Sequence, residues 1–421
     1  YPDILDEARW EMEMLLKMQV PEGNPKAGMA VHKLHDINWT SIPTAPHEDT
    51  MERIFLPPST AATLNLAASA AQSARLWKDY DPIFADKCLE AAENAWDAAQ
   101  MYPNEYASPE NGTGGGAYSD SNVEDEFYWA AAELFITTGK DEYLNYMQSS
   151  PYFLMVANPS STGTTEPFGW ANTGALGTVS LALVPNDLST NNVEVARQNI
   201  INAADEWINV QDNEGYGVPI TDYYWGSNSV VMNEAILMAY AYDFTTNDMY
   251  FDGVVESMDY ILGRNTLGQS YITGYGELAA TQPHHRFWAN AVSADYPKPP
   301  AGAVAGGANA GLEDPAPQEC YLDHIESYST NEVAINWNSP LAWLAAFLED
   351  MGEKDGEEIV YGDLDGSNSV NSMDYILMRR YLLGVSVDIN LEAADVNTNG
   401  SVDSIDYITL RRYLMGELDS F

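Results

Sequence analysis

Basic residues, cysteines and long apolar runs are scarce in this chain of 421 residues. Its 18 Lys and Arg face 63 Asp and Glu, and the net charge of −45 excludes nucleic acid and anionic membranes as partners because both are polyanionic. Cys88 and Cys320 are the only cysteines, which excludes a disulfide scaffold and leaves their redox state open. The longest apolar runs fall short of about 18 residues, so we expect no membrane span. A neutral polymer or a metal cation suits this surface better.

The apolar residues instead follow helical patterns. The hydrophobic fraction of 45% is enough to bury a core, and the spacing predicts helices at about 3–19, 57–78, 82–101, 122–138, 141–148, 173–184, 191–210, 228–245, 248–262 and 332–350. About ten helices joined by long loops fit an all-α toroid of antiparallel helix pairs better than a four-helix bundle. The chain begins at Tyr1 without an initiator Met, and we expect that it is cut from a longer precursor.

Residues 321–339 combine three acids, three aromatics and three asparagines directly before an apolar helix. Sugar cleavage needs such a set, because a carboxyl group protonates the leaving oxygen while flat rings stack on pyranose faces. The alternative is a polar loop whose acids only cap the helix that follows.

The C-terminal part contains an internal repeat with an offset of 32 residues, in which 363–374 matches 395–406. Each loop places oxygen-bearing residues at the EF-hand positions that bind Ca²⁺, and position 12 is Asp rather than Glu. The candidate ligands are Asp363, Asp365, Ser367, Ser369, Asn371 and Asp374 in one loop, and Asp395, Asn397, Asn399, Ser401, Asp403 and Asp406 in the other. The alternative is two acidic turns without metal.

Residues 361–421 resemble the type I dockerin, a module of two calcium loop-helix units, and 352–360 read as a linker. The resemblance implies two calcium ions and a protein partner, a cohesin on a scaffolding subunit. Either half of the repeat could face that partner. The family's recognition positions fall on Ser372, Met373, Arg379, Arg380, Ser404, Ile405, Arg411 and Arg412.

Residues 1–351 resemble the catalytic domain of family 9 glycoside hydrolases. The likeness rests on several stretches, among them 2–8, 57–62, 125–132, 270–276 with the His-x-Arg motif at 284–286, and 321–339. It implies an (α/α)₆ toroid whose first helices are missing, and hydrolysis of β-1,4-glucosidic bonds with inversion, by endoglucanase or cellobiohydrolase action.

The resemblance also implies roles for individual residues. Glu332 is the general acid, with Asp323 nine residues before it to orient neighbours or to raise its pKa, and His284 and Arg286 contact the sugar next to the cleaved bond. The substrate-contacting candidates are Trp225, Trp337, His285 and Tyr328. A third calcium ion is expected at Asp125 and Glu126, for which capping of a helix start is the alternative.

An inverting hydrolase needs a second carboxylate to activate water, and the family carries it in an Asp-Ala-Gly-Asp motif. That motif is absent from the sequence, and we expect it upstream of Tyr1. The leading hypothesis is a secreted, extracellular cellulase docked to a cellulosome. The alternatives are a catalytically inactive glucan-binding fragment that still docks, and a structural toroid with an adaptor role.

Overall fold

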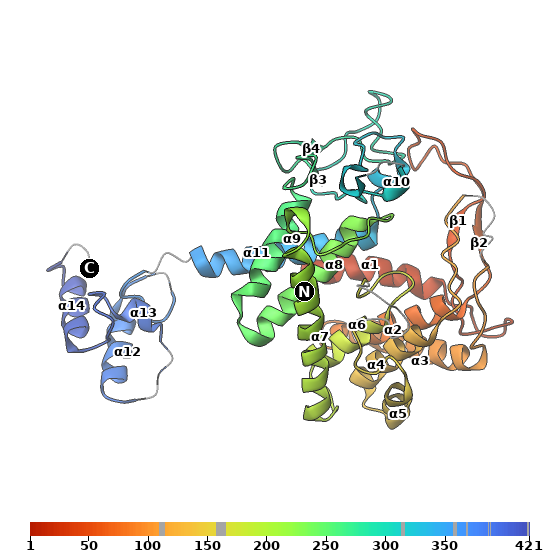
Figure 1. Cartoon of the computed structure of the whole chain (residues 1–421). Helices are drawn as coiled ribbons and strands as arrows, with labels where there is room; N and C mark the ends of the chain where they lie inside the picture. Colours follow the sequence, from red (N-terminus) through yellow and green to blue (C-terminus); the bar gives the residue numbers. More distant parts are fainter. Residues whose placement is uncertain are drawn as a thin grey trace. The chain divides into compact units, whose positions relative to one another are not determined.

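The computed structural model describes the chain except for residues 109–113, 157–165, 313–315, 357–359, 368, 386, 388 and 419–420. The backbone divides into two compact units, Tyr1–Ala345 and Ala346–Phe421, shown in Figure 1. No helix in the described ranges is both long and apolar enough to cross a membrane.

Helices build the first unit, as the sequence predicts. Ten helices of nine or more residues start within its described part, together with the four-residue α10 (Tyr328–Asn331). They are α1 (Asp3–Lys17), α2 (Thr60–Trp77), α3 (Pro82–Met101), α4 (Glu124–Thr138), α5 (Asp141–Ser149), α6 (Gly174–Leu183), α7 (Thr190–Gln211), α8 (Ser227–Thr245), α9 (Asp248–Ile261) and α11 (Ile335–Gly356). The all-α prediction is therefore confirmed.

Small buried side chains and capped ends explain the closest helix pair. Helices α2 and α3 pack on each other through faces rich in fully buried alanines, which let two backbones approach closely. The Ser59 hydroxyl accepts from the amide of Ala62 at 3.2 Å and starts α2, and the Asp81 carboxylate accepts from the amide of Phe84 at 3.1 Å and starts α3. Similar contacts join α4 to α6, α7 to α8 and α8 to α9.

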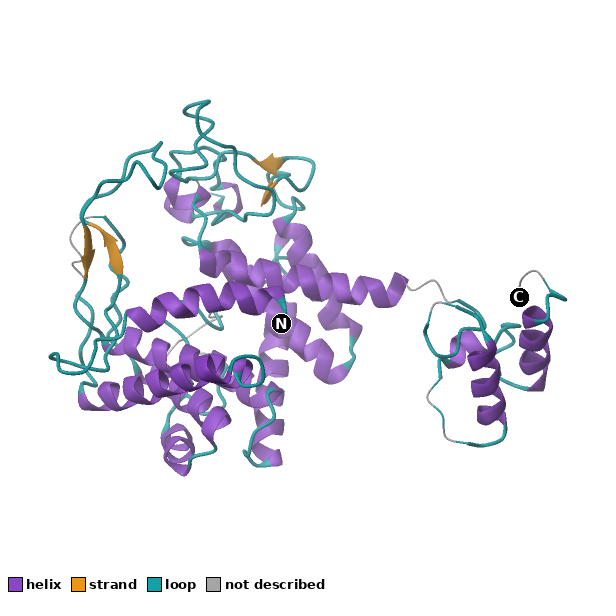
Figure 2. Ribbon diagram, turned by 180° about the vertical axis from the view of Figure 1, so that it is seen from behind, coloured by secondary structure: helices purple, strands orange, loops and turns teal. Residues whose placement is uncertain are grey.

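The loops and two small sheets gather on one side of these helices (Figure 2). Strands β1 (Leu34–Asp36) and β2 (Arg53–Phe55) pair antiparallel, and β3 (Ser270–Thr273) and β4 (Ala279–Ala280) pair parallel. Short 3₁₀ turns occur at η1 (Gly215–Gly217), η2 (Ala310–Leu312) and η3 (Pro317–Glu319). The candidate acid lies in this loop region.

The last helix of the first unit differs from the prediction at both ends. We expected it at about 332–350, but α11 begins at Ile335, and Glu332 lies before it in extended backbone with φ −63° and ψ 156°. Long-range pairing holds Glu332 out of the helix, because its carbonyl accepts from the amide of Gly306 at 2.9 Å. At the other end α11 continues to Gly356, so 352–356 are helical rather than linker, and 357–359 lie outside the described residues.

The second unit has a small core that follows the repeat. Its helices are α12 (Ser372–Leu382), α13 (Leu391–Ala394) and α14 (Ser404–Leu414). Leu364, Met378, Ala394 and Leu410 are fully buried together, and Met378 and Leu410 are equivalent positions 32 residues apart. Tyr375 and Tyr407, also equivalent, stack with ring centroids 4.5 Å apart. The two loop-helix units therefore pack as near copies around one core.

Candidate active site and calcium sites

The half-buried carboxyl group of Glu332 forms the centre of the candidate active site. Its Oε2 accepts a hydrogen bond from the Trp225 indole Nε1 at 3.0 Å. Burial raises the pKa of Glu332 above its ordinary value, while the Trp225 hydrogen bond and the charges of His284 and Arg286 act in the opposite direction. A carboxyl group with a raised pKa can stay protonated and donate a proton to a leaving group.

Aromatic rings surround this carboxyl group. The Trp225 and Tyr328 rings lie with centroids 5.7 Å apart at an angle of 35°, and 46% and 56% of the two residues is exposed, which leaves surface for a sugar ring. Trp337 has a different setting. Its half-buried indole packs on Gly226 so closely that a Cβ there would lie 2.9 Å from the ring, so this tryptophan supports the backbone that carries Trp225.

His284 lies beside Glu332 because their two segments pair as a parallel β-bridge. Its amide donates to the carbonyl of Asn331 at 2.7 Å, and its Nδ1 lies 2.5 Å from the carbonyl oxygen of Ile325. The imidazole is 6.0 Å from the Tyr328 ring, measured between centroids. The structure thus brings the predicted histidine and the predicted acid together.

The next two predicted residues also have defined contacts. Arg286 donates from Nε to the carbonyl of Thr40 at 3.2 Å, and its guanidinium carbon lies 5.8 Å from the centre of the Trp39 ring. His285 stacks on Trp288 with centroids 4.0 Å apart. Its Nδ1 accepts from the amide of Trp288 at 3.0 Å, and burial lowers its pKa. His285 is therefore held as a neutral ring whose Nδ1 serves the local backbone.

Asp323 binds backbone and does not act on the acid directly. Its Oδ2 accepts from the amide and the hydroxyl of Thr281, both at 2.8 Å, and its Oδ1 accepts from the amide of Gln282 at 2.9 Å. Burial is the first cause of the raised pKa of Glu332, and Asp323 is not among its causes. Of the two expected roles, the geometry supports orientation of the segment that leads to His284.

Sequence reasoning missed Tyr118 and Trp170, which lie on loops. Burial and then the charge of Glu332 raise the pKa of Tyr118, so its hydroxyl lies within electrostatic reach of the acid. The Tyr118 ring contacts Trp170 edge-on at 5.5 Å, and its backbone φ of 49° is unusual for a residue other than glycine. A tyrosine two positions after three consecutive glycines, Gly114 to Gly116, was the available signal.

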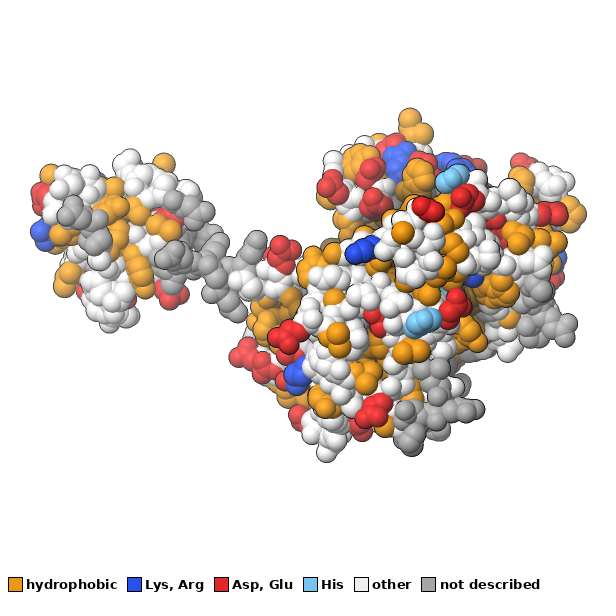
Figure 3. All heavy atoms as spheres, turned by 90° about the horizontal axis from the view of Figure 1, so that it is seen from above, with side chains coloured by type: hydrophobic (Ala, Val, Ile, Leu, Met, Phe, Trp, Pro, Cys, Tyr) orange, Lys and Arg blue, Asp and Glu red, His pale blue; other side chains and the backbone are white. Residues whose placement is uncertain are grey.

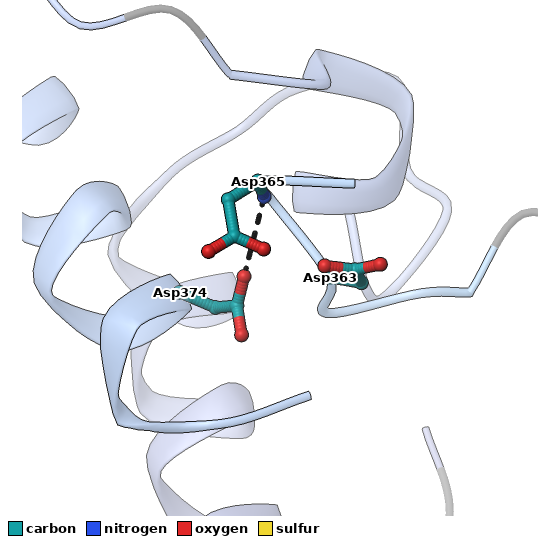
Figure 4. Close-up of side chains that lie close together, drawn as sticks. All are labelled: Asp363, Asp365 and Asp374. Atoms are coloured by element: carbon teal, nitrogen blue, oxygen red, sulfur yellow. Dashed lines mark hydrogen bonds between the residues drawn. The ribbon is translucent and has the colours of Figure 1, made fainter. Parts of the chain in front are cut away.

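The first repeat loop of the second unit gathers carboxylates. Oxygens of Asp363, Asp365 and Asp374 lie within 4.8 Å of one another, the only such acid, histidine or cysteine set among the described residues. Figure 4 shows Asp365 above Asp374, whose Oδ1 accepts from the amide of Asp365 at 3.3 Å. Three carboxylates this close repel one another unless a cation lies between them.

The second loop repeats this arrangement with Asn397 in place of Asp365 and with Asp403 in place of Asn371. Asp406 occupies the position of Asp374, and its Oδ1 accepts from the side chain of Asn397 at 2.7 Å. In both loops positions 9 and 12 also form a capping box that starts the next helix, through Asn371 and Asp374 in α12 and Asp403 and Asp406 in α14. Ser367, Ser369, Asn399 and Ser401 line the same loops.

The predicted partner-binding residues lie on the surface of α12 and α14. Met373 and Ile405, at equivalent positions of the repeat, are 51% and 57% exposed. The other six, Ser372, Arg379, Arg380, Ser404, Arg411 and Arg412, are exposed as well.

Family profiles match both units. The profile of Glycosyl hydrolase family 9 matches residues 1–345. The chain belongs to Glycosyl hydrolase family 9. The profile of the Dockerin type I domain matches residues 361–415, so this family 9 chain carries a type I dockerin.

Named relatives and a solved structure agree with this assignment. A cellulose 1,4-beta-cellobiosidase of Acetivibrio thermocellus is 49% identical over 94% of the chain and 48% of the relative. Endoglucanase C of Cellulomonas fimi is 45% identical over 83% of the chain and 33% of the relative. A structure titled Bacteroides ovatus GH9 matches with a TM-score of 0.73 at 32% identity, over 83% of this chain and 63% of that one. The family 9 chain thus spans about half or less of the length of these two curated relatives.

Type I dockerin domains bind calcium, and the two loops of this family 9 chain fit such ions. The first loop offers three carboxylates and the serine oxygens of 367 and 369. The second offers Asp395, Asp403 and Asp406 with the amide oxygens of two asparagines. Both donor sets consist of oxygen alone, which Ca²⁺ prefers over softer metals.

The third predicted calcium site, at Asp125 and Glu126 in α4, has buried unpaired oxygens. Among the described residues, one oxygen each of Asp120 and Asp125 and both of Glu126 are buried without a hydrogen-bond partner. Burial, Asp125 and Asp120 raise the pKa of Glu126 to about 9. No side-chain hydrogen bond caps the start of α4, but Glu124, Asp125 and Glu126 lie in its first turn, as the alternative of acids at a helix start requires. Unlike the carboxylates of the first dockerin loop, these three do not bring oxygens within 4.8 Å of one another, so the third calcium site stays a prediction.

On the face seen in Figure 3, the acidic side chains of this family 9 chain are scattered rather than gathered in one patch. Figure 3 shows Asp and Glu side chains spread over the visible face among polar and apolar ones. This agrees with the net charge of −45.

Proposed function

We propose that this chain is part of a cellulase that hydrolyses β-1,4-glucosidic bonds in cellulose or related β-glucans, with Glu332 as the general acid. The observation that carries the proposal is the half-buried Glu332, which has a raised pKa and lies beside the partly exposed rings of Trp225 and Tyr328. Membership of family 9 and the cellobiosidase and endoglucanase among its relatives agree with this activity.

In the proposed mechanism Glu332 donates its proton to the glycosidic oxygen as the bond breaks. His284, which lies beside Glu332, and Arg286 hydrogen-bond sugar hydroxyls in this mechanism, and Trp225 offers its ring face. A second carboxylate activates water on the opposite face of the sugar, so the anomeric centre inverts. That base is expected in an Asp-Ala-Gly-Asp motif, which the 421 residues do not contain.

The test is Glu332→Gln in the complete gene product, assayed on cellulose oligosaccharides. We expect kcat to fall by about 10²- to 10⁴-fold, the usual contribution of a general acid. Glu326→Gln is the matched control, because Glu326 is an exposed acid in the same segment. Unchanged hydrolysis by Glu332→Gln would refute the assignment. The anomeric form of the first product, followed by NMR, tests inversion separately.

The loops next to Arg286 support cleavage near chain ends. Thr44 donates to the carbonyl of Arg286 at 3.0 Å, and the Tyr296 hydroxyl donates to Glu48 at 2.5 Å, so the loop between β1 and β2 is tied to the loop after β4. In this proposal the connection, at a residue expected to contact the sugar, limits the entry of a long glucan chain from that side. We therefore include cellobiohydrolase action in the proposal. A rapid fall in the viscosity of soluble cellulose per bond cleaved would contradict it.

The dockerin indicates the setting of this activity. We propose that it binds a cohesin of a scaffolding protein, which makes the enzyme a secreted, extracellular, cellulosome-associated protein. The exposed Met373 and Ile405 at equivalent positions support a protein partner. The alternative of an inactive glucan-binding module receives no support from the relatives' names.

A further inference from the structure

The residue before the acid, Asn331, is completely buried and has an unusually full set of contacts. Its side-chain nitrogen donates to the carbonyl of Gln282 and to Asp323 Oδ1, the latter at 3.2 Å. Its side-chain oxygen accepts from the Tyr321 hydroxyl at 2.7 Å. One amide therefore joins the 281–284 segment to the 321–332 segment.

The backbone of Asn331 strengthens the same connection. Its carbonyl accepts the amide of His284 at 2.7 Å, within the bridge that pairs His284 with Glu332. Because Glu332 is the next residue and the His284 amide is bonded to this carbonyl, a rotation of the Asn331 peptide would shift the carboxyl group of Glu332 relative to the imidazole of His284. The relative position of the two groups thus depends on this residue.

A rigid aromatic support lies on the other side of Asn331. The Tyr321 ring packs edge-on against Tyr271 of β3 with centroids 4.7 Å apart, and Tyr271 is fully buried. Burial raises the pKa of Tyr321, so its hydroxyl remains a hydrogen-bond donor. Tyr321 can therefore hold the Asn331 amide in one orientation, with its nitrogen toward Gln282 and Asp323.

We propose that Asn331, fixed by Tyr321 and Asp323, is a positioning residue that sets the reach of Glu332 toward the leaving oxygen. The inference rests on the proposed role of Glu332 as the acid. Asn331 does not contact the substrate, and its effect passes through the peptide that it shares with Glu332.

The dependence on leaving group separates this role from a purely structural one. A strongly acidic phenol such as dinitrophenol leaves the sugar as its anion and needs no proton. Phenol is a poorer leaving group and needs a proton from the general acid. Displacement of Glu332 therefore slows the phenyl substrate and spares the dinitrophenyl substrate. Partial unfolding slows both equally.

The experiment measures kcat of the complete gene product on phenyl and dinitrophenyl cellobiosides. For Asn331→Ala we expect about 10²-fold loss on the phenyl substrate, as for about 1 Å of misplacement, and less than about 3-fold on the dinitrophenyl substrate. Tyr321→Phe keeps the ring and removes only the hydroxyl, so it should show the same selectivity with a smaller loss. It remains informative if Asn331→Ala does not fold.

Asn265→Ala is the matched control. Asn265 is also buried, and its side chain donates to the carbonyls of Tyr260 and Gln269 at 2.9 and 2.8 Å, in a loop that does not adjoin Glu332. It should lower thermal stability without leaving-group selectivity. The inference would be overturned if kcat of Tyr321→Phe and Asn331→Ala fell equally on both substrates. It would also be overturned if kcat of both variants stayed unchanged. If Glu332→Gln itself hydrolyses phenyl cellobioside at the wild-type rate, the proposed function fails instead.

Discussion

The hydrogen bond from the Trp225 indole opposes the effect of burial on Glu332. It stabilises the carboxylate, so it lowers a pKa that burial raises. In Trp225→Phe the carboxylate loses this donor and the pKa of Glu332 rises further. Because the acid works only when protonated, the alkaline limb of the kcat profile should move to higher pH.

This shift can be measured on a small aryl cellobioside. Loss of ring area in Trp225→Phe raises KM as well. The informative quantity is therefore the apparent pKa of the alkaline limb in the pH profile of kcat, and not the maximal value of kcat. Trp10→Phe is the control, because Trp10 is 82% exposed on α1. An alkaline limb that stays in place, or moves to lower pH, would show that Trp225 does not stabilise the charged form.

A second buried carboxyl group, Glu234 of α8, makes stability depend on pH. Burial raises its pKa well above the ordinary value, Glu166 adds to this, and its Oε2 has no hydrogen-bond partner in the described part of the chain. When the pKa of a carboxyl group is higher in the folded state than in the unfolded state, the folded protein loses stability as the pH rises above the unfolded-state pKa. The loss continues until the pH reaches the folded-state pKa. Glu234→Gln removes the ionisable group with little change in shape.

We therefore expect Glu234→Gln to raise the melting temperature at pH 8 to 9 by at least about 2 °C, and to change it less at pH 5. Calorimetry of wild type and variant at both pH values checks this. Glu206→Gln, an exposed position on α7, should leave the melting temperature unchanged at both. A larger gain at pH 5 would contradict the argument.

The resemblance to family 9 identified Glu332, Asp323, His284 and Arg286, and the structure brings them into one region. It could not identify Asn331 or Tyr118, because neither belongs to a spacing pattern. Their importance arises from contacts with residues 10 and more positions away, such as Tyr321 and Glu332.

At the level of elements, periodicity predicted the ten long helices but not the break before α11. Glu332 and its neighbours fit a helical pattern, yet Glu332 pairs with Gly306 and lies in a bridge with His284. Such pairing between distant segments overrides local preference. At its other end α11 continues to Gly356, into the expected linker. There the sequence has Glu353 and Lys354, two residue types that favour helix.

The calcium loops should control the dockerin helices. Asp374 accepts from the amides of Leu364 and Asn371, both at 2.7 Å, so it orders the loop and starts α12. Without calcium, repulsion from Asp363 and Asp365 opposes this arrangement. We expect a fragment of 358–421 to lose helical circular dichroism in chelator and to regain it with Ca²⁺. Equal spectra in both conditions would contradict the prediction.

A single-loop variant sharpens this test. Asp374→Ala should reduce the bound calcium, measured by calorimetry, from two ions to one and disorder α12 first. Asp406→Ala should do the same to the second loop and α14. Loss of both ions in either variant would show that the loops do not bind independently.

On the scale of the whole molecule, the sequence revealed two units because the second is built from a visible repeat. The observed division between Ala345 and Ala346 lies six residues before the predicted end of the first domain, within α11. Continuous helical propensity across a boundary leaves no composition signal there, so sequence alone could not place it.

The repeat also predicts how the dockerin binds. Ser372 and Met373 start α12 as Ser404 and Ile405 start α14, and all four are exposed on helices that pack around one core. Because the two faces are near copies, we expect either of them to bind the proposed cohesin partner. Charged substitutions at Ser372 and Met373 alone should weaken binding less than about 10-fold, since the second face remains.

The same substitutions at both faces should abolish binding, far beyond the sum of the two single-face losses. Calorimetric titration with a cohesin measures this, and unchanged calcium binding shows that the fold is intact. If one single-face variant already abolishes binding, only that half of the repeat contacts the partner. The small differences between the halves, such as Met373 against Ile405, would then decide the orientation.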